Sequence, residues 1–277
     1  MTSVEAYKVN GTTFDGAQYS IESVTQSTPL IRGENLTPAM DHGLRWREKR
    51  LGGRTETWRM WITDADPTTG MSPAGTKAQR AQFHENWDVV MSILNTTHAA
   101  SGYDAPLQVI RIMQDTPSSP VDMYRVNYGE TRGQISVSDH RPFSTAKFTV
   151  NVLYVDPRWY ECNSAGAKTT STLTATGNPD GTALMTDMTI TLGDGSVNDP
   201  YIENTTTGSK LTFSGNPNGA IVINTKDYTL TDNGTNAIGS LDRTGSTTTD
   251  WFRLQPNISN TLASNTTFSI AYTKAFI

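Results

Sequence analysis

The composition of this chain changes abruptly at the run from Asp156 to Tyr160. The first 160 of the 277 residues hold five of the six tryptophans and 33 Asp, Glu, Lys and Arg residues, whereas the last 117 hold only 16 charged residues. About half of those 117 are Thr, Ser, Asn or Gly. The whole chain is also longer than the roughly 100 to 200 residues of one typical domain. We therefore expect a first domain over residues 1–162, a linker over 163–174 and a second domain over 175–277.

Charge and cysteine content exclude several classes of protein. The formal charge of -5 divides into -1 for the first 160 residues and -4 for the rest, so neither part is a polycation suited to avid nonspecific nucleic-acid binding. The single Cys162 excludes an intrachain disulfide and a multi-cysteine zinc site, which is typical of a reduced compartment. The start of the chain has no signal-peptide pattern, and no uncharged apolar stretch approaches the roughly 18 residues of a membrane span. We expect a soluble, unsecreted protein.

The first domain alternates with the period of two that is typical of half-buried strands. The clearest example ends the domain and places Phe148, Val150, Val152 and Tyr154 on one face. The end of this strand, at Leu153 and Val155, is apolar on both sides, so we expect something to cover it. Weaker alternation occurs at residues 19–21, 58–62, 109–113 and 135–137. We therefore expect at least five strands in this domain.

One helix is predicted over about residues 76–96. Thr76 precedes Gln79 by three residues, as in a capping box. An apolar stripe follows at helical spacing, formed by Phe83, Trp87, Val90, Met91 and Leu94. Such a stripe must be buried against a sheet or a neighbouring subunit.

The segment from Arg45 to Arg59 carries the only local excess of basic residues. Tryptophans 46, 58 and 61 are interleaved with six basic residues, namely Arg45, Arg47, Lys49, Arg50, Arg54 and Arg59. Three interpretations stay open: a solvated strand edge or hairpin that turns at Gly52-Gly53, a protein interface whose arginines grip carboxylates, and a surface on which nucleic-acid bases stack.

The second domain reads as an all-β sandwich. Short apolar runs recur about every 8 to 12 residues and are separated by turn pairs such as Asn218-Gly219 and Asn233-Gly234. The high Ser, Thr, Asn and Gly content could also indicate disorder. Ile221–Ile223, Trp251-Phe252 and Phe268 nevertheless provide enough large apolar side chains for a small core.

No catalytic signature is present. The chain lacks a phosphate-binding Gly-x-x-x-x-Gly-Lys loop, a His-Glu-x-x-His pair and a Gly-x-Ser-x-Gly elbow, and its four histidines are scattered. Nothing marks a carboxylate pair for glycoside cleavage. We assign no catalytic, cofactor-binding or metal residues, expect no cofactor, and predict that the protein is not an enzyme.

The order of these motifs resembles the distal tail proteins, which lie at the tip of long non-contractile phage tails. In the first domain the resemblance rests on the Arg/Trp-rich strand, the single helix and the final strand that runs into Asp156–Tyr160. In the second it rests on Asp199–Asn204, Gly208–Phe213, Ala220–Ile223, Asn233-Gly234, Leu241-Asp242 and Asp250–Pro256. One departure is Pro256-Asn257, where the family commonly has Pro-Gly; Asn also tolerates a left-handed turn.

The resemblance implies a mainly β fold, with a ring-forming, sandwich-like N-terminal domain that has one helix, and a galectin-like C-terminal β-sandwich. It implies a structural role in the virion tail tip: a hexameric ring made in the host cytoplasm, joined to the tail tube and to tail-tip or receptor-binding proteins. DNA would pass through its channel without sequence-specific binding. The candidate subunit contacts are Arg45, Arg47, Arg50, Arg54, Trp58, Trp87, Leu153 and Val155.

A carbohydrate-binding protein that recognises host-surface glycans is the alternative, because galectin-like sandwiches can bind sugar on an aromatic face. Trp251 is then the candidate for stacking on sugar. Alternation requires either Trp251 or Phe252 to point inward, so Trp251 is also a candidate core residue. A hydrolase of cell-wall glycan is a third, more distant reading.

Overall fold

The structure is a computed structural model that describes residues 4–29, 31–32, 50–95, 106–116, 119–141, 144–193, 197–246 and 251–277. It is mainly β, with one α-helix among these residues, as the sequence predicts. The chain divides into two compact units. The first unit comprises Met1–Pro157 with Cys162–Ala167, and the second comprises Arg158–Glu161 with Lys168–Ile277.

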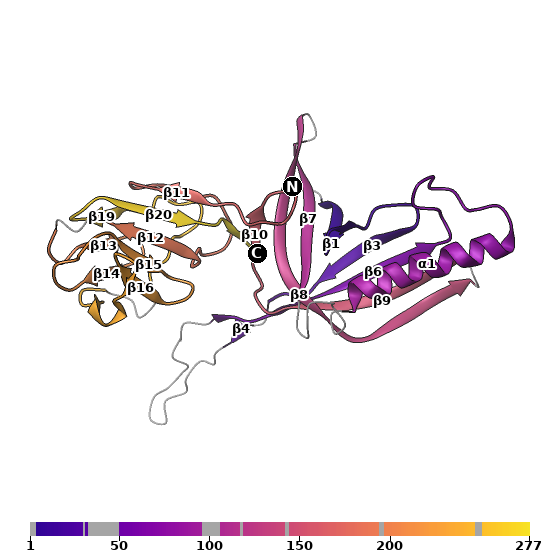
Figure 1. The fold of residues 1–277 in the computed structure, drawn as a ribbon, viewed down its shortest axis with the longest axis horizontal. Coiled ribbons are helices and arrows are strands. Elements are labelled where there is room, and N and C mark those ends of the chain that lie inside the picture. The colour runs from indigo at the N-terminus through magenta and orange to yellow at the C-terminus, as the bar shows by residue number, and fades with distance from the viewer. Residues whose placement is uncertain are drawn as a thin grey trace, which may run out of the picture. The chain divides into compact units, whose positions relative to one another are not determined.

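The first unit is built on an antiparallel sheet with the strand order β2-β1-β7-β8-β9-β6-β3 (Figure 1). Its strands are β1 (Val4–Val9), β2 (Thr12–Thr13), β3 (Tyr19–Gln26), β6 (Arg54–Thr63), β7 (Leu107–Thr116), β8 (Ser119–Arg141) and β9 (Thr145–Tyr154). A separate short pair consists of β4 (Ile31–Arg32) and β5 (Arg50–Leu51).

The pairing of β6 with β9 forms the centre of the first core. The predicted face of β9 is confirmed, since Phe148, Val150, Val152 and Tyr154 are all buried. The even-numbered residues of β6 are buried on the same face because the register sets Trp58 against Val150. Side chains directly opposite in an antiparallel pair are close neighbours, so these two rows pack together, apolar from Trp58 to Ile62 and charged at Arg54 and Glu56.

Helix α1 (Thr76–Leu94) lies alongside β6 and β9 (Figure 1). Its buried residues include Phe83, Val90 and Leu94 from the predicted stripe. Its Asn86 is buried as well, and Nδ2 donates to the carbonyls of Thr63 and Ala65, each at 2.8 Å. These bonds fasten the helix to the end of β6. Among the described residues no helix is both long and apolar enough to cross a bilayer.

The predicted capping box of α1 is wrong. Thr76 is the first helical residue, and the N-cap is Gly75, which has φ 91° and no side chain to cap the helix. Glycine adopts this left-handed conformation at low cost, so the chain turns sharply into the helix there. The helix ends at Leu94, close to the predicted end.

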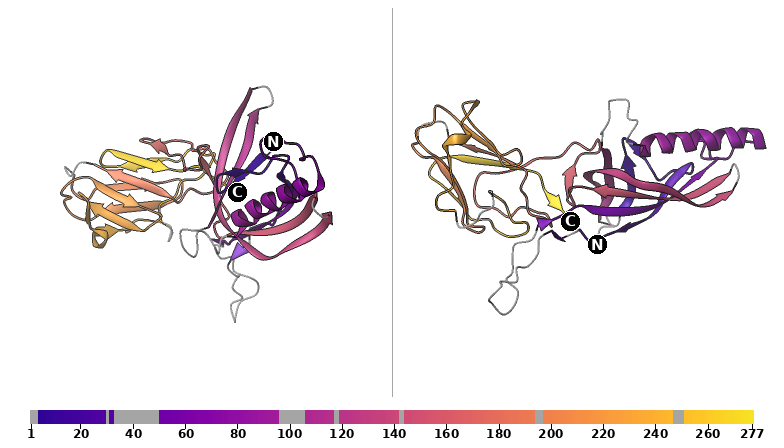
Figure 2. Two further views of the ribbon diagram at one scale, coloured as in Figure 1. Left: turned by 45° about the vertical axis from the view of Figure 1, so that its right-hand side comes forward. Right: turned by 90° about the horizontal axis from the view of Figure 1, so that it is seen from below.

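The second unit is a β-sandwich of two antiparallel sheets, coloured from salmon-pink through orange to yellow in Figure 2. The larger sheet has the order β11-β20-β12-β15-β16-β17, with β11 (Ser171–Leu173), β12 (Met188–Leu192), β15 (Ile221–Asn224), β16 (Thr229–Asp232), β17 (Thr235–Asn236) and β20 (Phe268–Tyr272). The smaller has the order β18-β14-β13-β19, with β13 (Tyr201–Asn204), β14 (Ser209–Phe213), β18 (Leu241–Asp242) and β19 (Leu262–Ser264). A 3-10 turn, η2 (Ile238–Ser240), precedes β18.

Each sheet buries one face. In the larger sheet Ile190 of β12 lies opposite both Ile223 and Ile270, and all three are buried. In the smaller sheet the buried pair is Ile202 and Leu211. The alternating threonines of the predicted strands face outward, where the hydroxyl is solvated and β-branching favours the strand.

The run after Asp156 forms the first strand of the second unit. Strand β10 (Trp159–Cys162) pairs with the last strand, β21 (Ala275–Phe276), and buries Trp159 and Tyr160. Part of the segment that we predicted as a linker is structured, because β11 pairs with β20.

Two buried asparagines organise the loops of the second unit. Asn204 Nδ2 donates to the Asn260 Oδ1 at 3.0 Å and to the carbonyl of Arg253 at 2.9 Å. Asn260 Oδ1 also accepts from the backbone N–H of Gln255 at 2.9 Å, and its Nδ2 donates to the carbonyl of that residue. One amide therefore closes a loop and pairs with a second amide in the core.

We expect Asn260→Ala to destabilise the second unit by about 1–3 kcal/mol, because it leaves buried polar groups without partners. Urea unfolding monitored by circular dichroism would measure the loss. Asn198→Ala, at an exposed site, is the matched control and should change stability by no more than about 0.5 kcal/mol. Equal effects of the two substitutions would contradict the assigned role of Asn260.

Candidate functional site

The residues predicted to form subunit contacts occupy different environments. Arg45 and Arg47 lie outside the described residues, and Arg50 lies in β5, where only the backbone is described. Arg54 and Trp58 are buried in the core of the first unit. Arg54 and Trp58 therefore make their contacts within the core of the first unit.

Arg54 and Trp58 belong to a group that we call the Glu56 cluster, with Glu56, Arg111 and Tyr154. The Glu56 carboxylate is 0 % exposed. Its Oε2 accepts hydrogen bonds from the Tyr154 hydroxyl at 3.1 Å and from Trp58 Nε1 at 3.2 Å. Its Oε1 accepts from Arg111 and lies 3.8 Å from Arg54 Nη2. Both carboxylate oxygens are thus engaged.

The two guanidinium groups of the cluster are also flanked by aromatic rings. Arg111 lies over the ring of Tyr7 at 5.8 Å, and Arg54 lies over the ring of Tyr154 at 5.9 Å, within the range of cation–π attraction. Through these contacts β1, β6, β7 and β9 all contribute to one charged centre. Its geometry joins strands and leaves the carboxylate no access to a substrate.

Burial sets the protonation states around the carboxylate. Loss of solvation, followed by the nearby Glu56 charge, raises the pKa of Tyr154 well above its usual value, so its hydroxyl remains a donor. Burial lowers the pKa of Arg54, and Glu56 opposes that change. The carboxylate and the two guanidinium groups lie together in a buried site, where opposite charges can compensate for the loss of solvation.

The other three candidate contacts lie nearer the surface of the first unit. Trp87 is partly exposed on α1, although its ring also packs on Phe148 with centroids 5.8 Å apart. Leu153 is partly exposed in β9, and Val155, just past that strand, is 75 % exposed. The predicted apolar end of β9 is therefore uncovered within its own unit at Val155.

In the second unit, Phe252 rather than Trp251 points into the core. Phe252 is buried, whereas Trp251 is partly exposed. The ring of Trp251 packs edge-to-face with Tyr228, with centroids 5.0 Å apart and planes at 65°. Arg243 lies 5.9 Å from the centre of the same Trp251 ring. Sequence reasoning missed Tyr228, which comes from the turn between β15 and β16, and Arg243, which follows β18, because no local pattern links either residue to Trp251.

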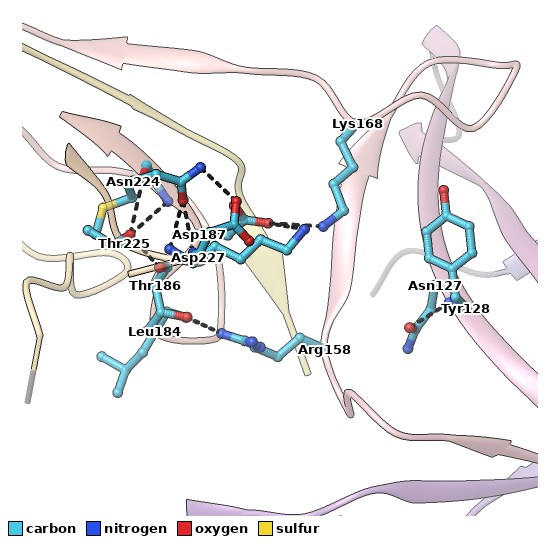
Figure 3. Close-up of polar contacts among 12 residues, drawn as sticks. Asn127, Tyr128, Arg158, Lys168, Leu184, Thr186, Asp187, Asn224, Thr225 and Asp227 are labelled. Atoms are coloured by element: carbon cyan, nitrogen blue, oxygen red, sulfur yellow. Dashed lines mark hydrogen bonds and ion pairs between the residues drawn. The ribbon is translucent and has the colours of Figure 1, made fainter. Parts of the chain in front are cut away.

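A second polar group holds the incoming chain of the second unit (Figure 3). Arg158 Nη1 donates to Thr186 Oγ1 at 2.6 Å, and Lys168 Nζ lies 3.2 Å from Asp187 Oδ2. Lys168 also lies over the Tyr160 ring at 3.5 Å. These contacts fix the segment from Arg158 to Glu161 against the sandwich and explain its place in the second unit.

The described residues contain no group of three or more His, Cys, Asp or Glu side chains arranged to hold a metal ion. The Glu56 cluster is closed to ligands by burial. The candidate functional surfaces are therefore the exposed apolar end of β9 and the aromatic group around Tyr228.

The chain is similar to a solved structure over almost its whole length. The phage SPP1 Dit (gp 19.1) protein, described as a paradigm of the hub adsorption apparatus in phages that infect Gram-positive hosts, matches with a TM-score of 0.64 at 17 % identity. The match covers 98 % of this chain and 99 % of that protein. The expected fold of a distal tail protein is thereby confirmed.

Two structures of the phage P2 baseplate in its activated conformation, one with Ca and one with Sr, also match over 97 % of each chain. Their TM-scores of 0.39 at 9 % identity are too low to establish a shared fold. No family model and no curated protein matches this sequence.

We expect Glu56→Gln to destabilise the first unit by about 3–5 kcal/mol, because it leaves two buried guanidinium groups without their counter-charge. Differential scanning calorimetry would detect the loss as a lower unfolding temperature. Glu22→Gln is the control, since Glu22 and Lys147 form a half-exposed ion pair in the same sheet. That change should cost less than about 1 kcal/mol.

The buried Tyr154 predicts a loss of stability in alkali. Its pKa is raised in the fold, so the contribution is fully present below the unfolded value of about 10 and is lost as pH rises towards the folded pKa. The unfolding free energy should fall by up to about 1.4 kcal/mol per pH unit above that value.

Urea titrations from pH 8 to 11 would test this prediction. Tyr154→Phe should reduce the alkaline slope, and at pH 8 it should cost about 1.5–3 kcal/mol through the lost hydrogen bond to a charged group. Tyr128→Phe, at an exposed position, is the control. An alkaline slope that Tyr154→Phe leaves unchanged would contradict the prediction.

Proposed function

We propose that this chain is a structural component of a phage tail tip, a ring-shaped hub that joins the tail tube to the host-adsorption apparatus. The observation that carries the proposal is the end-to-end similarity to the SPP1 Dit protein, which includes both units. The architecture agrees with it, because the Glu56 cluster is buried and joins strands.

In this proposal the first unit forms a hexameric ring, which leaves a channel that passes DNA without reading its sequence. The β-sandwich of the second unit is galectin-like in the proposal. Tail-tube and tail-tip or receptor-binding proteins are the partners, and the assembled protein resides in the virion. Catalysis has no part in this role.

Identical subunits close a ring by heterologous contacts, in which one patch meets a different patch on the next copy. We assign one of these patches to Leu153 and Val155 at the end of β9, with Trp87 on α1 as a further contact. A neighbouring subunit that covers the exposed Val155 removes apolar surface from water and so stabilises the assembly. The arginines at positions 45, 47 and 50 remain candidate contacts to acidic groups.

Native mass spectrometry of the purified chain tests the ring. A hexamer is the expected species, and Val155→Asp should shift the population towards monomers because it places a charge in an apolar contact. The fold of the variant, followed by circular dichroism, should be unchanged, since Val155 is 75 % exposed in its unit.

Met71→Asp is the matched control. Met71 is 74 % exposed, belongs to the same unit and is not among the proposed contacts. Its hexamer should persist. A chain that stays monomeric at tens of micromolar, or a hexamer that Val155→Asp leaves intact, would contradict the proposed ring or its assigned contact.

A further inference from the structure

Three Asn-Gly pairs occur in this chain, and each lies in a connection between two strands. They are Asn10-Gly11, Asn218-Gly219 and Asn233-Gly234. An asparagine followed by glycine is especially prone to spontaneous loss of its side-chain amide, because glycine has no side chain to hinder the two groups that react. The three pairs share this chemistry, so differences in their reactivity must come from the structure around them.

The reaction takes place within the Asn-Gly pair. The backbone nitrogen of the glycine loses its proton and attacks Cγ of the asparagine, which closes a five-membered succinimide ring and releases ammonia. Water then opens the ring at either carbonyl, and the products are aspartate and isoaspartate. Three conditions follow: the glycine N–H must be able to lose its proton, the asparagine side chain must be able to turn, and the connection must be able to open.

The carboxylate of Asp232, which is only 7 % exposed, holds both reacting groups of the Asn218-Gly219 pair. Its Oδ1 accepts from the Gly219 backbone N–H at 3.1 Å, and its Oδ2 accepts from Asn218 Nδ2 at 2.9 Å. The Asn218 backbone N–H donates to both oxygens, each at 2.9 Å. Hydrogen bonds to a carboxylate are strong, and a negative charge beside the glycine N–H disfavours the loss of its proton. This pair is therefore protected.

The Asn10-Gly11 pair, between β1 and β2, is held through its asparagine. Asn10 Oδ1 accepts from the backbone N–H of Gln108 at 2.9 Å, and the Asn10 backbone N–H donates to the carbonyl of Gln108, also at 2.9 Å. Both bonds tie the turn to β7. The side chain of Asn10 must break the first bond before its Cγ can reach the glycine nitrogen.

The Asn233-Gly234 pair lacks such restraints. Among the described residues, no hydrogen bond engages the Asn233 side chain or the Gly234 N–H, and both residues are exposed. The Asn233 backbone N–H donates to the carbonyl of Ala220 at 3.1 Å, but that nitrogen takes no part in the reaction. The turn leads into β17, a two-residue strand at the edge of the larger sheet whose residues are both exposed. Such an edge opens at low cost.

We propose that Asn233 is a site of spontaneous deamidation, and that Asp232 protects the Asn218-Gly219 pair from the same reaction. Deamidation adds a negative charge next to Asp232, and the isoaspartate product inserts a methylene group into the backbone of the turn. The pairing of β16 with β17 depends on this two-residue turn, so the product disturbs the edge of the sheet. The modified fraction increases with the age of the protein. The proposal concerns the second unit alone and does not depend on the hub function.

Peptide mapping by mass spectrometry tests the proposal on the full, folded chain. Trypsin places the three pairs in different peptides, namely residues 9–32, 211–226 and 227–243, and fragmentation assigns the modified position. During incubation at mildly alkaline pH, Asn233 should react at least about tenfold faster than Asn218, and also faster than Asn10. The product should contain isoaspartate as well as aspartate, because both arise from the ring. Equal rates at Asn233 and Asn218, or aspartate alone, would overturn the proposal.

Two comparisons separate the effect of the fold from that of the sequence. In guanidinium chloride, which unfolds the chain, the three pairs should react at similar rates, and a gap that persists there would overturn protection by the fold. Asp232→Asn removes the carboxylate charge but keeps its shape, so it should raise the rate at Asn218 by about tenfold. Asn10, in the first unit, is the internal control and should react as before.

Circular dichroism checks the fold of Asp232→Asn. An unchanged rate at Asn218 in the folded variant would contradict the protecting role of Asp232. If the variant does not fold, the comparison between the native chain and the chain in guanidinium chloride decides.

Discussion

The sheet of the first unit depends on a carboxylate that has no contact with water. Glu56 would be costly to bury alone, and it is tolerated because two guanidinium groups, a phenol and an indole converge on it. Arg111 and Tyr154 come from β7 and β9, whereas Glu56 lies on β6, so these contacts to the carboxylate form in only one strand register. A shift of β6 by one residue would turn Glu56 to the surface and leave Arg111 buried without it. The cluster thus selects one arrangement of the strands.

This cluster also shows where sequence reasoning fails. The alternation of β9 and the apolar stripe of the helix predicted real elements, because apolar periodicity reports directly on burial. The basic segment from Arg45 to Arg59 predicts a solvated edge, a protein interface or a nucleic-acid surface, since charge normally indicates exposure. The even-numbered positions from Arg54 to Ile62 did carry a signal of one shared face. The partner Arg111 lies 55 residues away, and no local pattern links it to Glu56.

Other differences have local causes. A threonine three residues before a glutamine predicted a capping box, but Gly75 turns the chain one residue earlier, so the threonine hydroxyl does not take the cap position. In the second unit the alternation narrowed the choice to Trp251 or Phe252, and packing decided for Phe252. Tyr228 was invisible as a site residue, because its conformation follows from a turn whose geometry depends on Asn224.

The second unit begins and ends on neighbouring strands, because β10 pairs with β21. Loops at the far end of a sandwich with this topology can lengthen or change without moving either chain end. A fluorescent protein or affinity tag fused after Ile277 would lie close to Trp159, because Trp159 pairs with Phe276. Such a label would report on the end of the sandwich where the chain enters the second unit. A probe of Tyr228 would instead have to be attached within the turn that joins β15 to β16.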